Sequence, residues 1–224
     1  LLNRQGLPLL IVWALNFSIY LLVQATIGKK LLLDYLGMSS ASAALFTFMM
    51  MLTTMFAALS GGFLLRLTQY RRKPMIFVSL FCTLGAVVLL FVGVRTGMGP
   101  AWFMTAYALL ALSALGTPAS GALMKELNPP QAVGTAVGVL NGSAYMAVAV
   151  LTNIAGLVMD RFAAGAARTP AGAIIYPAAA YEAIFMFCCI LSLSAILIAL
   201  RFMREGPGVG EVSAAIPAES NGRN

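Results

Sequence analysis

Six long stretches of this chain contain no charged residue, and each is long enough to cross a lipid bilayer. A transmembrane helix needs about 20 mostly apolar residues to cross about 30 Å of hydrocarbon. A charge at its centre costs roughly 2.5–3.5 kcal/mol on insertion scales. The missing charges therefore indicate that lipid, rather than water, surrounds these segments. The uncharged runs are residues 5–28, 35–65, 74–94, 96–124, 127–159 and 183–200.

The composition supports this interpretation. Hydrophobic residues make up 61% of the chain and charged residues only 9%, whereas soluble domains carry about 25% charged residues. The net charge of +7 comes from basic residues that flank the apolar runs, where they meet lipid headgroups. We therefore expect the lipid bilayer as a partner and no nucleic acid.

The residue types needed for common enzyme chemistry are missing. The chain has no His, and the sequence offers neither metal-ligand spacing nor paired intramembrane carboxylates. Three cysteines, all inside apolar runs, are expected to be small buried hydrophobic side chains. We expect no metal, no cofactor and no enzymatic activity. The cysteines are Cys82, Cys188 and Cys189.

We predict an all-α membrane protein whose six transmembrane helices occupy a domain over residues 1–204. The remaining residues, 205–224, are rich in Gly, Pro, Ser and Ala and are expected to form a disordered cytoplasmic tail. Because the chain begins with Leu1 and shows no signal peptide, we expect it to be a segment of a longer chain. The helices are expected at about 7–28, 41–65, 74–94, 102–124, 132–158 and 181–203.

The basic residues predict the orientation. With six spans, nine of the 14 basic residues fall on the side of the termini and five on the opposite side. The densest cluster, Arg71-Arg72-Lys73, lies in a short loop on the side of the termini. The positive-inside rule then places both termini in the cytoplasm. We expect a multi-pass protein of a bacterial inner membrane.

The first predicted helix carries a row of polar side chains. Asn16, Tyr20 and Gln24 recur every four residues and so share one helix face, with Trp13 one turn earlier. An amide facing lipid would lose its hydrogen bonds, so this face is expected to meet protein or a water-filled cavity. Solute binding and interhelical hydrogen bonding both remain open.

Other candidates lie on the fourth and fifth predicted helices. On the fifth, Gly134, Gly138 and Gly142 form a double G-x-x-x-G pattern, which favours close helix packing, and Gly156 continues that face. Additional solute contacts are predicted at Asn141, Tyr145, Tyr107 and Ser113. The sequence Gly116-Thr117-Pro118 predicts a bend in the fourth helix.

Charged groups are expected only at helix ends. Lys125, Glu126 and Glu182 are interpreted as interfacial charges that form ion pairs. No predicted span has a central carboxylate, arginine or lysine, so these residues supply no evident proton-coupling group.

A weak internal repeat links the second and fifth helices. Residues 61–66 (GGFLLR) end one, and residues 156–161 (GLVMDR) end the other on the opposite side of the membrane. This arrangement is what an inverted three-plus-three repeat predicts.

These stretches resemble the major facilitator superfamily, specifically its C-terminal six-helix half, over about residues 7–203. Residues 61–74 resemble the family's cytoplasmic loop motif, and residues 134–161 resemble its glycine-rich eleventh helix. Leu65 stands where the motif usually has Asp, and the basic cluster comes two residues late. The residues matched to gating and loop motifs are Gly61, Gly62, Arg66, Arg71, Arg72, Asp160 and Arg161.

The resemblance implies a twelve-helix transporter that works by alternating access. The first and fourth helices of this segment would line the central cavity, the second and fifth would face the other half, and the third and sixth would lie outside. It also implies a partner, an N-terminal six-helix half in the missing part of the same chain.

Three functions are consistent with the sequence. The leading hypothesis is secondary active transport of a small polar solute, such as an organic acid or a sugar-like compound, because amides, phenols and hydroxyls favour hydrogen bonding. Efflux of hydrophobic compounds is the second, with Trp13, Tyr20 and Met49–Met51 lining an adaptable apolar cavity. The third, from another class, is a six-helix membrane scaffold or pore.

Overall fold

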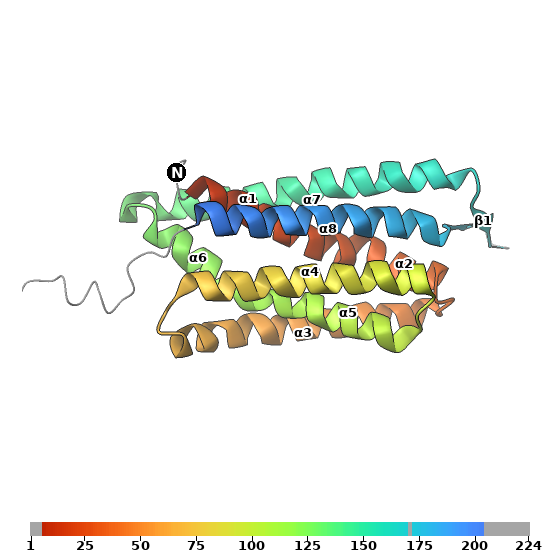
Figure 1. Cartoon of the computed structure of the whole chain (residues 1–224), viewed down its shortest axis with the longest axis horizontal. Coiled ribbons are helices and arrows are strands. Elements are labelled where there is room, and N and C mark those ends of the chain that lie inside the picture. The colour runs from red at the N-terminus through yellow and green to blue at the C-terminus, as the bar shows by residue number, and fades with distance from the viewer. Residues whose placement is uncertain (1–5, 170–171, 204–224) are drawn as a thin grey trace, which may run out of the picture.

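A computed structural model describes residues 6–169 and 172–203. Six helical spans in this part of the chain are long and apolar enough to cross a membrane, which confirms the predicted fold class. They run alternately up and down along one axis (Figure 1). The predicted tail at 205–224 lies outside the described residues.

Three of the spans are single α-helices and three contain or adjoin a different helix type. The helical elements are α1 (Gly6–Leu21), the π-helix η1 (Leu22–Ile27), α2 (Gly28–Asp34), α3 (Ser40–Leu67), α4 (Arg72–Thr96), α5 (Pro100–Leu112), the 3₁₀ helix η2 (Ser113–Gly116), α6 (Thr117–Glu126), the 3₁₀ helix η3 (Pro130–Ala132), α7 (Val133–Ala163) and α8 (Ala178–Phe202).

The first span is longer than the sequence pattern predicted. It continues from α1 through η1 to the end of α2 at Asp34, although Lys29 and Lys30 were expected to lie in a loop. Lys30 and Asp34 are four residues apart and form an ion pair on the same helix face, which favours the extra helical turns. The predicted boundary near residue 28 was therefore wrong.

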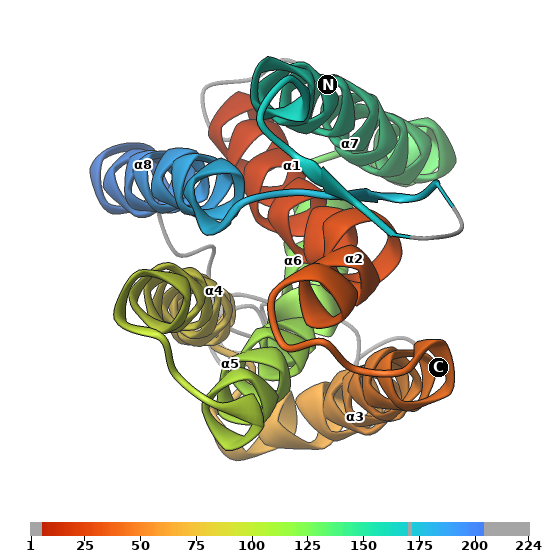
Figure 2. The same ribbon diagram turned by 90° about the vertical axis from the view of Figure 1, so that its right-hand side faces the viewer.

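The connection between the fifth and sixth predicted helices, expected at about 132–158 and 181–203, also holds more structure than the sequence indicated. Helix α7 continues to Ala163. Two short strands, β1 (Ala167–Arg168) and β2 (Ile174–Ile175), then pair antiparallel, with Ala167 opposite Ile175. In Figure 2 this hairpin crosses the end of the bundle between α7 and α2.

Seen along the long axis, α1 and α6 lie in the middle of the bundle, with α4 and α8 side by side at one flank (Figure 2). Helices α3 and α7 are the least covered. Only 22% of the most apolar stretch of each is buried, against 39–61% for the other four spans.

The buried side chains form two apolar cores at different depths. The first surrounds Leu22, Leu90 and Phe185, and the second surrounds Leu9, Leu80 and Ala195. Between them lies a band of buried polar residues, which we call the polar layer: Asn16, Ser79, Ser113 and Ser192. Near Pro118, where a bend was predicted, the α-helix is interrupted by the 3₁₀ turn η2, which lies in this layer directly before Thr117 and Pro118.

Candidate functional site

The polar layer links three helices through side chains that sequence spacing alone could not pair. Asn16 Nδ2 on α1 donates to Ser79 Oγ on α4 at 3.0 Å. Ser79 Oγ in turn donates to the backbone oxygen of Ser113 in η2 at 2.5 Å. Asn16 is 6% exposed and Ser79 is 3% exposed. These hydrogen bonds therefore replace water for groups deep inside the bundle.

The break in the fourth span explains why the Ser113 oxygen is available. In an α-helix this oxygen would accept from the backbone N–H of Thr117. That N–H donates instead to Ala114 O, as a 3₁₀ turn requires. Gly116 permits the close approach of α4, because a Cβ atom there would lie 2.6 Å from Ser79 Cβ.

A small cavity, which we call the polar cavity, opens beside this layer. Its volume is about 60 Å³, and it lies among α1, α3 and the broken fourth span. Tyr20 donates its hydroxyl to Thr54 Oγ1 at 3.1 Å across the cavity edge. Every lining residue is uncharged: Trp13, Asn16, Phe17, Tyr20, Thr54, Ser113, Ala114 and Thr117.

Two buried polar atoms of the lining residues have no hydrogen-bond partner within the described part of the chain. They are the Nε1 donor of Trp13 and the Oδ1 acceptor of Asn16. An unsatisfied buried group costs about 1–3 kcal/mol. Both atoms are closed to solvent in this conformation, so they are an unsatisfied donor and an unsatisfied acceptor on residues that line the cavity.

Aromatic rings form one wall of the cavity. Phe17 stacks on Trp13 with ring centroids 5.7 Å apart, and Tyr145 of α7 meets Phe17 edge-on at 5.4 Å. Phe17 was missed by the sequence analysis. Its position four residues after Trp13, on the same helix face, was the available signal.

The remaining predicted solute contacts lie elsewhere. Gln24 is half-buried inside η1 and is not among the residues that line the polar cavity, since the α-helical four-residue repeat does not continue through a π-helix. Tyr107 is buried and donates to Gly28 O at 2.9 Å. Asn141 is exposed on α7. The structure thus brings Asn16, Tyr20 and Ser113 together around the polar cavity, whereas Tyr145, among the ring contacts of the described residues, meets only the Phe17 ring behind it.

The glycines of α7 face open space. Gly134, Gly138, Gly142 and Gly156 would each accept a Cβ atom without meeting any described atom within 4 Å. The packing partner predicted for this face is therefore not among the described residues. Gly61 of α3 differs, because a Cβ atom there would lie 2.4 Å from Leu115 O.

One basic residue directly after the loop between α3 and α4, at the start of α4, is buried. Arg72 is 9% exposed and pairs with Glu126 at the end of α6. Its guanidinium also lies 5.6 Å from the centre of the Tyr70 ring. Arg66 and Arg71 are exposed. This contact confirms the ion pair expected for Glu126, and its place at the membrane interface stays a prediction.

The other loop-motif residues lie at both ends of the bundle. Arg66 is near the end of α3, whereas Asp160 and Arg161 are near the end of α7, and Figure 1 shows these two helix ends at opposite ends of the molecule. Both Asp160 and Arg161 are exposed. Leu65, at the position where the motif usually has Asp, is 7% exposed within the second apolar core.

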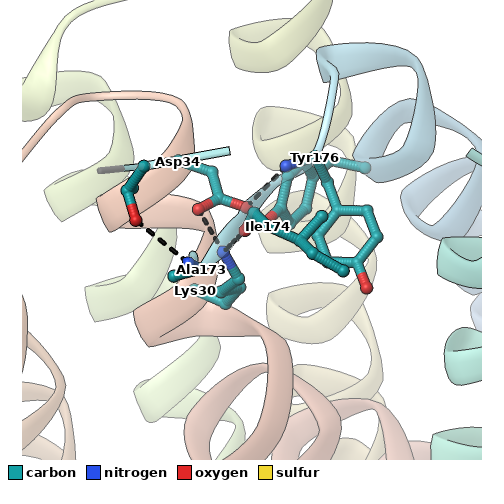
Figure 3. A network of polar contacts seen from close by, with 7 residues as sticks. Lys30, Asp34, Ala173, Ile174 and Tyr176 are labelled. Atoms are coloured by element: carbon teal, nitrogen blue, oxygen red, sulfur yellow. Dashed lines mark hydrogen bonds and ion pairs between the residues drawn. The ribbon is translucent and has the colours of Figure 1, made fainter. Parts of the chain in front are cut away.

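A polar cluster that sequence reasoning missed lies at the end of the bundle opposite the loop between α3 and α4. Figure 3 shows its contacts. We call it the Asp34 cluster. The Asp34 side chain is 3% exposed. Its Oδ1 accepts from Lys30, and its Oδ2 accepts from the Tyr176 backbone N–H at 3.0 Å and from the Tyr181 hydroxyl at 2.8 Å. Lys30 also donates to Ile174 O at 2.5 Å.

Two further contacts fix the same end. Arg95 pairs with Glu182 at 3.2 Å, and Tyr35 donates to the oxygen of Val94 at 3.1 Å. Burial, and then the Glu182 carboxylate, raise the pKa of Tyr35 above its ordinary value. Both effects favour the protonated phenol, which donates this hydrogen bond.

Comparison with models of protein families finds that the one described as Major Facilitator Superfamily matches residues 9–221. A search of curated proteins finds no match to the chain. Within residues 6–169 and 172–203, no group of three or more His, Cys, Asp or Glu side chains could hold a metal ion.

Proposed function

Because this chain belongs to the major facilitator superfamily, we propose that it forms one half of a secondary transporter that moves a small polar solute by alternating access. The chain is a multi-pass membrane protein of a transporter family that is generally non-enzymatic. The proposal includes the solute class, the mechanism, and an inner-membrane location with both termini in the cytoplasm.

One observation carries the proposal: the unpartnered Trp13 donor and Asn16 acceptor beside the same cavity. Asn16 lies in the polar layer between the two apolar cores, and Trp13 belongs to the second core one turn away on the same helix. In this proposal the polar layer lies near the middle of the membrane. A polar site at this depth is costly in lipid and typical of a transport pathway.

The same pair favours a sugar-like solute over an organic acid. An ionised carboxylate only accepts hydrogen bonds, whereas a hydroxyl both donates and accepts. Hydroxyl groups therefore suit both the Asn16 oxygen and the Trp13 N–H. The apolar face of a sugar ring also suits the aromatic wall at Phe17. The uncharged lining offers an anion no counter-charge.

Efflux of hydrophobic compounds is supported less well. That hypothesis required Trp13, Tyr20 and the methionines at 49–51 to line one cavity. Trp13 and Tyr20 line the polar cavity, whereas Met49 and Met50 line a different groove between α3 and α5.

The exposed faces of α3 and α7 support a second six-helix half as the partner. These spans expose apolar and small side chains that include Phe56, Leu59 and the α7 glycines. In this proposal a second helical unit on these faces completes the polar cavity, which at about 60 Å³ is too small by itself for a sugar-like solute, since ligand sites usually measure about 300–1,000 Å³.

The test is uptake into membrane vesicles by the natural protein, using neutral hexoses and polyols in parallel with monocarboxylates. We expect saturable uptake of a neutral solute. Asn16→Ala should raise KM about tenfold, because it removes a hydrogen-bond partner worth about 1–2 kcal/mol. The matched control is Asn128→Ala, since Asn128 lies in the connection after α6, away from the polar cavity, and its amide bonds to Met124 O of the preceding helix.

Three results would contradict the proposal. Uptake restricted to carboxylates would show that the solute is not sugar-like. An unchanged KM in Asn16→Ala, at normal membrane expression, would show that the solute does not bind at Asn16. Flux that never saturates would indicate a pore.

A further inference from the structure

The first span is interrupted by the π-helix η1, which lies between the polar cavity and α2. In a π-helix a backbone N–H bonds five residues back instead of four, as the Gly28 N–H does with Val23 O. The π-helical turn therefore holds one more residue than an α-helical turn. Tyr20, the last residue of this span that lines the polar cavity, comes two residues before η1 begins at Leu22.

Gly28 is fitted to the π-helical form of this turn. A Cβ atom at this position would lie 2.1 Å from Val23 O and 2.8 Å from the Tyr107 hydroxyl oxygen, so it would overlap both oxygens. Tyr107 also donates to Gly28 O at 2.9 Å. Any other residue in this place would have to push the Tyr107 side chain and the Val23 carbonyl away.

Conversion of η1 to an α-helix would shift α2 by one residue relative to α1. The turn would then need one residue fewer, so each residue of α2 would take the place now held by the next one. Such a shift turns α2 by about 100° and moves it by about 1.5 Å along its axis. Ile27 would occupy the place of Gly28, and Leu33 would occupy the place of Asp34.

The contacts of α2 distinguish these two registers. In the present register Asp34 accepts two hydrogen bonds, from the segment that leads into α8 and from α8 itself. Leu33 in the same place would accept none. At the other end of α2, Ile27 would collide with Tyr107, since even a Cβ atom at the Gly28 position lies too close to it. Contacts at both ends of α2 therefore hold η1 in the π-helical form.

We infer that the first span is a two-register switch. Its η1 turn is π-helical while the Asp34 cluster is closed, and it becomes α-helical when α2 turns and releases the β1–β2 hairpin. The inference rests on the proposed transport function, in which the end of the bundle near the α2–α3 turn opens and closes. Asn16 and Tyr20 precede η1 on α1, so these two cavity residues keep their places while α2 turns.

Deletion of Ala25, an exposed residue inside η1, tests the switch. The deletion removes the extra residue, so the first span becomes a continuous α-helix that keeps Asp34 in its present place. We expect the affinity for the neutral hexose that the natural protein takes up to be unchanged and its uptake to be lost, because no second register remains. The matched control is Ala25→Ser, which preserves the residue count and should preserve uptake.

Hydrogen exchange shows whether the deletion variant keeps the present contacts. A peptide covering residues 172–180 includes the Tyr176 amide that donates to Asp34. Its protection should be as high in the deletion variant as in the natural protein, because the Asp34 cluster stays closed.

A second variant acts in the opposite direction and needs no solute. Gly28→Ala places a Cβ atom against Val23 O and so disfavours the π-helical form, whereas alanine favours an α-helix. Protection of the 172–180 peptide should fall about tenfold, although residue 28 lies six positions before Asp34. The control is Gly61→Ala, whose Cβ atom would lie 2.4 Å from Leu115 O and which should leave protection of this peptide unchanged.

Three results would overturn the inference. Uptake by the Ala25 deletion variant at the natural rate would show that transport does not need the π-helix. Faster exchange of the 172–180 peptide in that variant would show that η1 does not hold one extra residue. An equal loss of protection in Gly28→Ala and Gly61→Ala would indicate general destabilisation.

The two kinds of measurement separate this inference from the proposed function. If the natural protein takes up no neutral solute, the proposed function fails. The exchange results for Gly28→Ala and its control still decide whether the span changes register, and they do so even if the deletion variant does not accumulate.

Discussion

Replacing Asp34 by Asn should release the hairpin and the start of α8 from the end of α2. The substitution keeps the shape of the side chain but removes its charge. Asp34 accepts two hydrogen bonds from across the bundle, from the Tyr176 N–H and the Tyr181 hydroxyl. Its third partner, Lys30, lies on its own helix.

The expected cost follows from these contacts. A hydrogen bond to a charged acceptor contributes about 1.5–3 kcal/mol and a neutral one about 0.5–1.5 kcal/mol, so losing the charge costs about 1 kcal/mol for each of the two bonds. The Lys30 side chain is 35% exposed, and solvent screening limits its pair to about 0–1 kcal/mol. The sum is about 2–3 kcal/mol.

Hydrogen exchange of the Tyr176 amide reports this loss directly, because that N–H is one of the donors. With about 1.4 kcal/mol for each tenfold change, protection of a peptide covering residues 172–180 should fall roughly 30- to 140-fold. The control is Asp160→Asn, since Asp160 is exposed at the same end of the bundle, and it should change protection little.

A double-mutant cycle measures the interaction between Asp34 and Tyr181. Tyr181→Phe removes the second donor, and combining it with Asp34→Asn should show a coupling of about 0.5–3 kcal/mol. Unchanged protection in Asp34→Asn, or purely additive effects in the cycle, would refute the role given to the Asp34 cluster.

Two further predictions concern the opposite half of the molecule. Gly61→Ala should destabilise the protein by about 1–3 kcal/mol in thermal unfolding, since its Cβ atom would lie 2.4 Å from a backbone oxygen of η2. Gly62→Ala meets no described atom within 4 Å and should be neutral or slightly stabilising; equal losses would refute the close approach. Glu126→Gln should cost about 1–2 kcal/mol in the same assay, because it leaves the buried Arg72 without its ion pair. Lys125→Gln, at an exposed neighbour, should have no such effect, and an equal loss there would contradict the pairing.

The sequence predicted the positions of single helices, but it did not indicate which side chains of different helices contact each other. The row formed by Asn16 and Tyr20 was visible from spacing, and both side chains line the polar cavity. The same reasoning extended the row to Gln24, but the π-helix begins at Leu22 and changes which residues share a face. Nothing in the spacing of Ser79 indicated that it would bond to both Asn16 and Ser113.

The Asp34 cluster shows the same limit. Its members come from the end of α2, from β2 and from α8, and the contacts with Asp34 span up to 147 positions along the chain. A lone aspartate after an apolar run gives no signal of such partners.

The sequence by itself determined that the chain crosses a membrane six times, because insertion into lipid depends on the local apolar content of about 20 consecutive residues. Only the tertiary structure decided which polar atoms remain free beside the polar cavity, since a buried donor or acceptor is satisfied or left open by side chains from other helices.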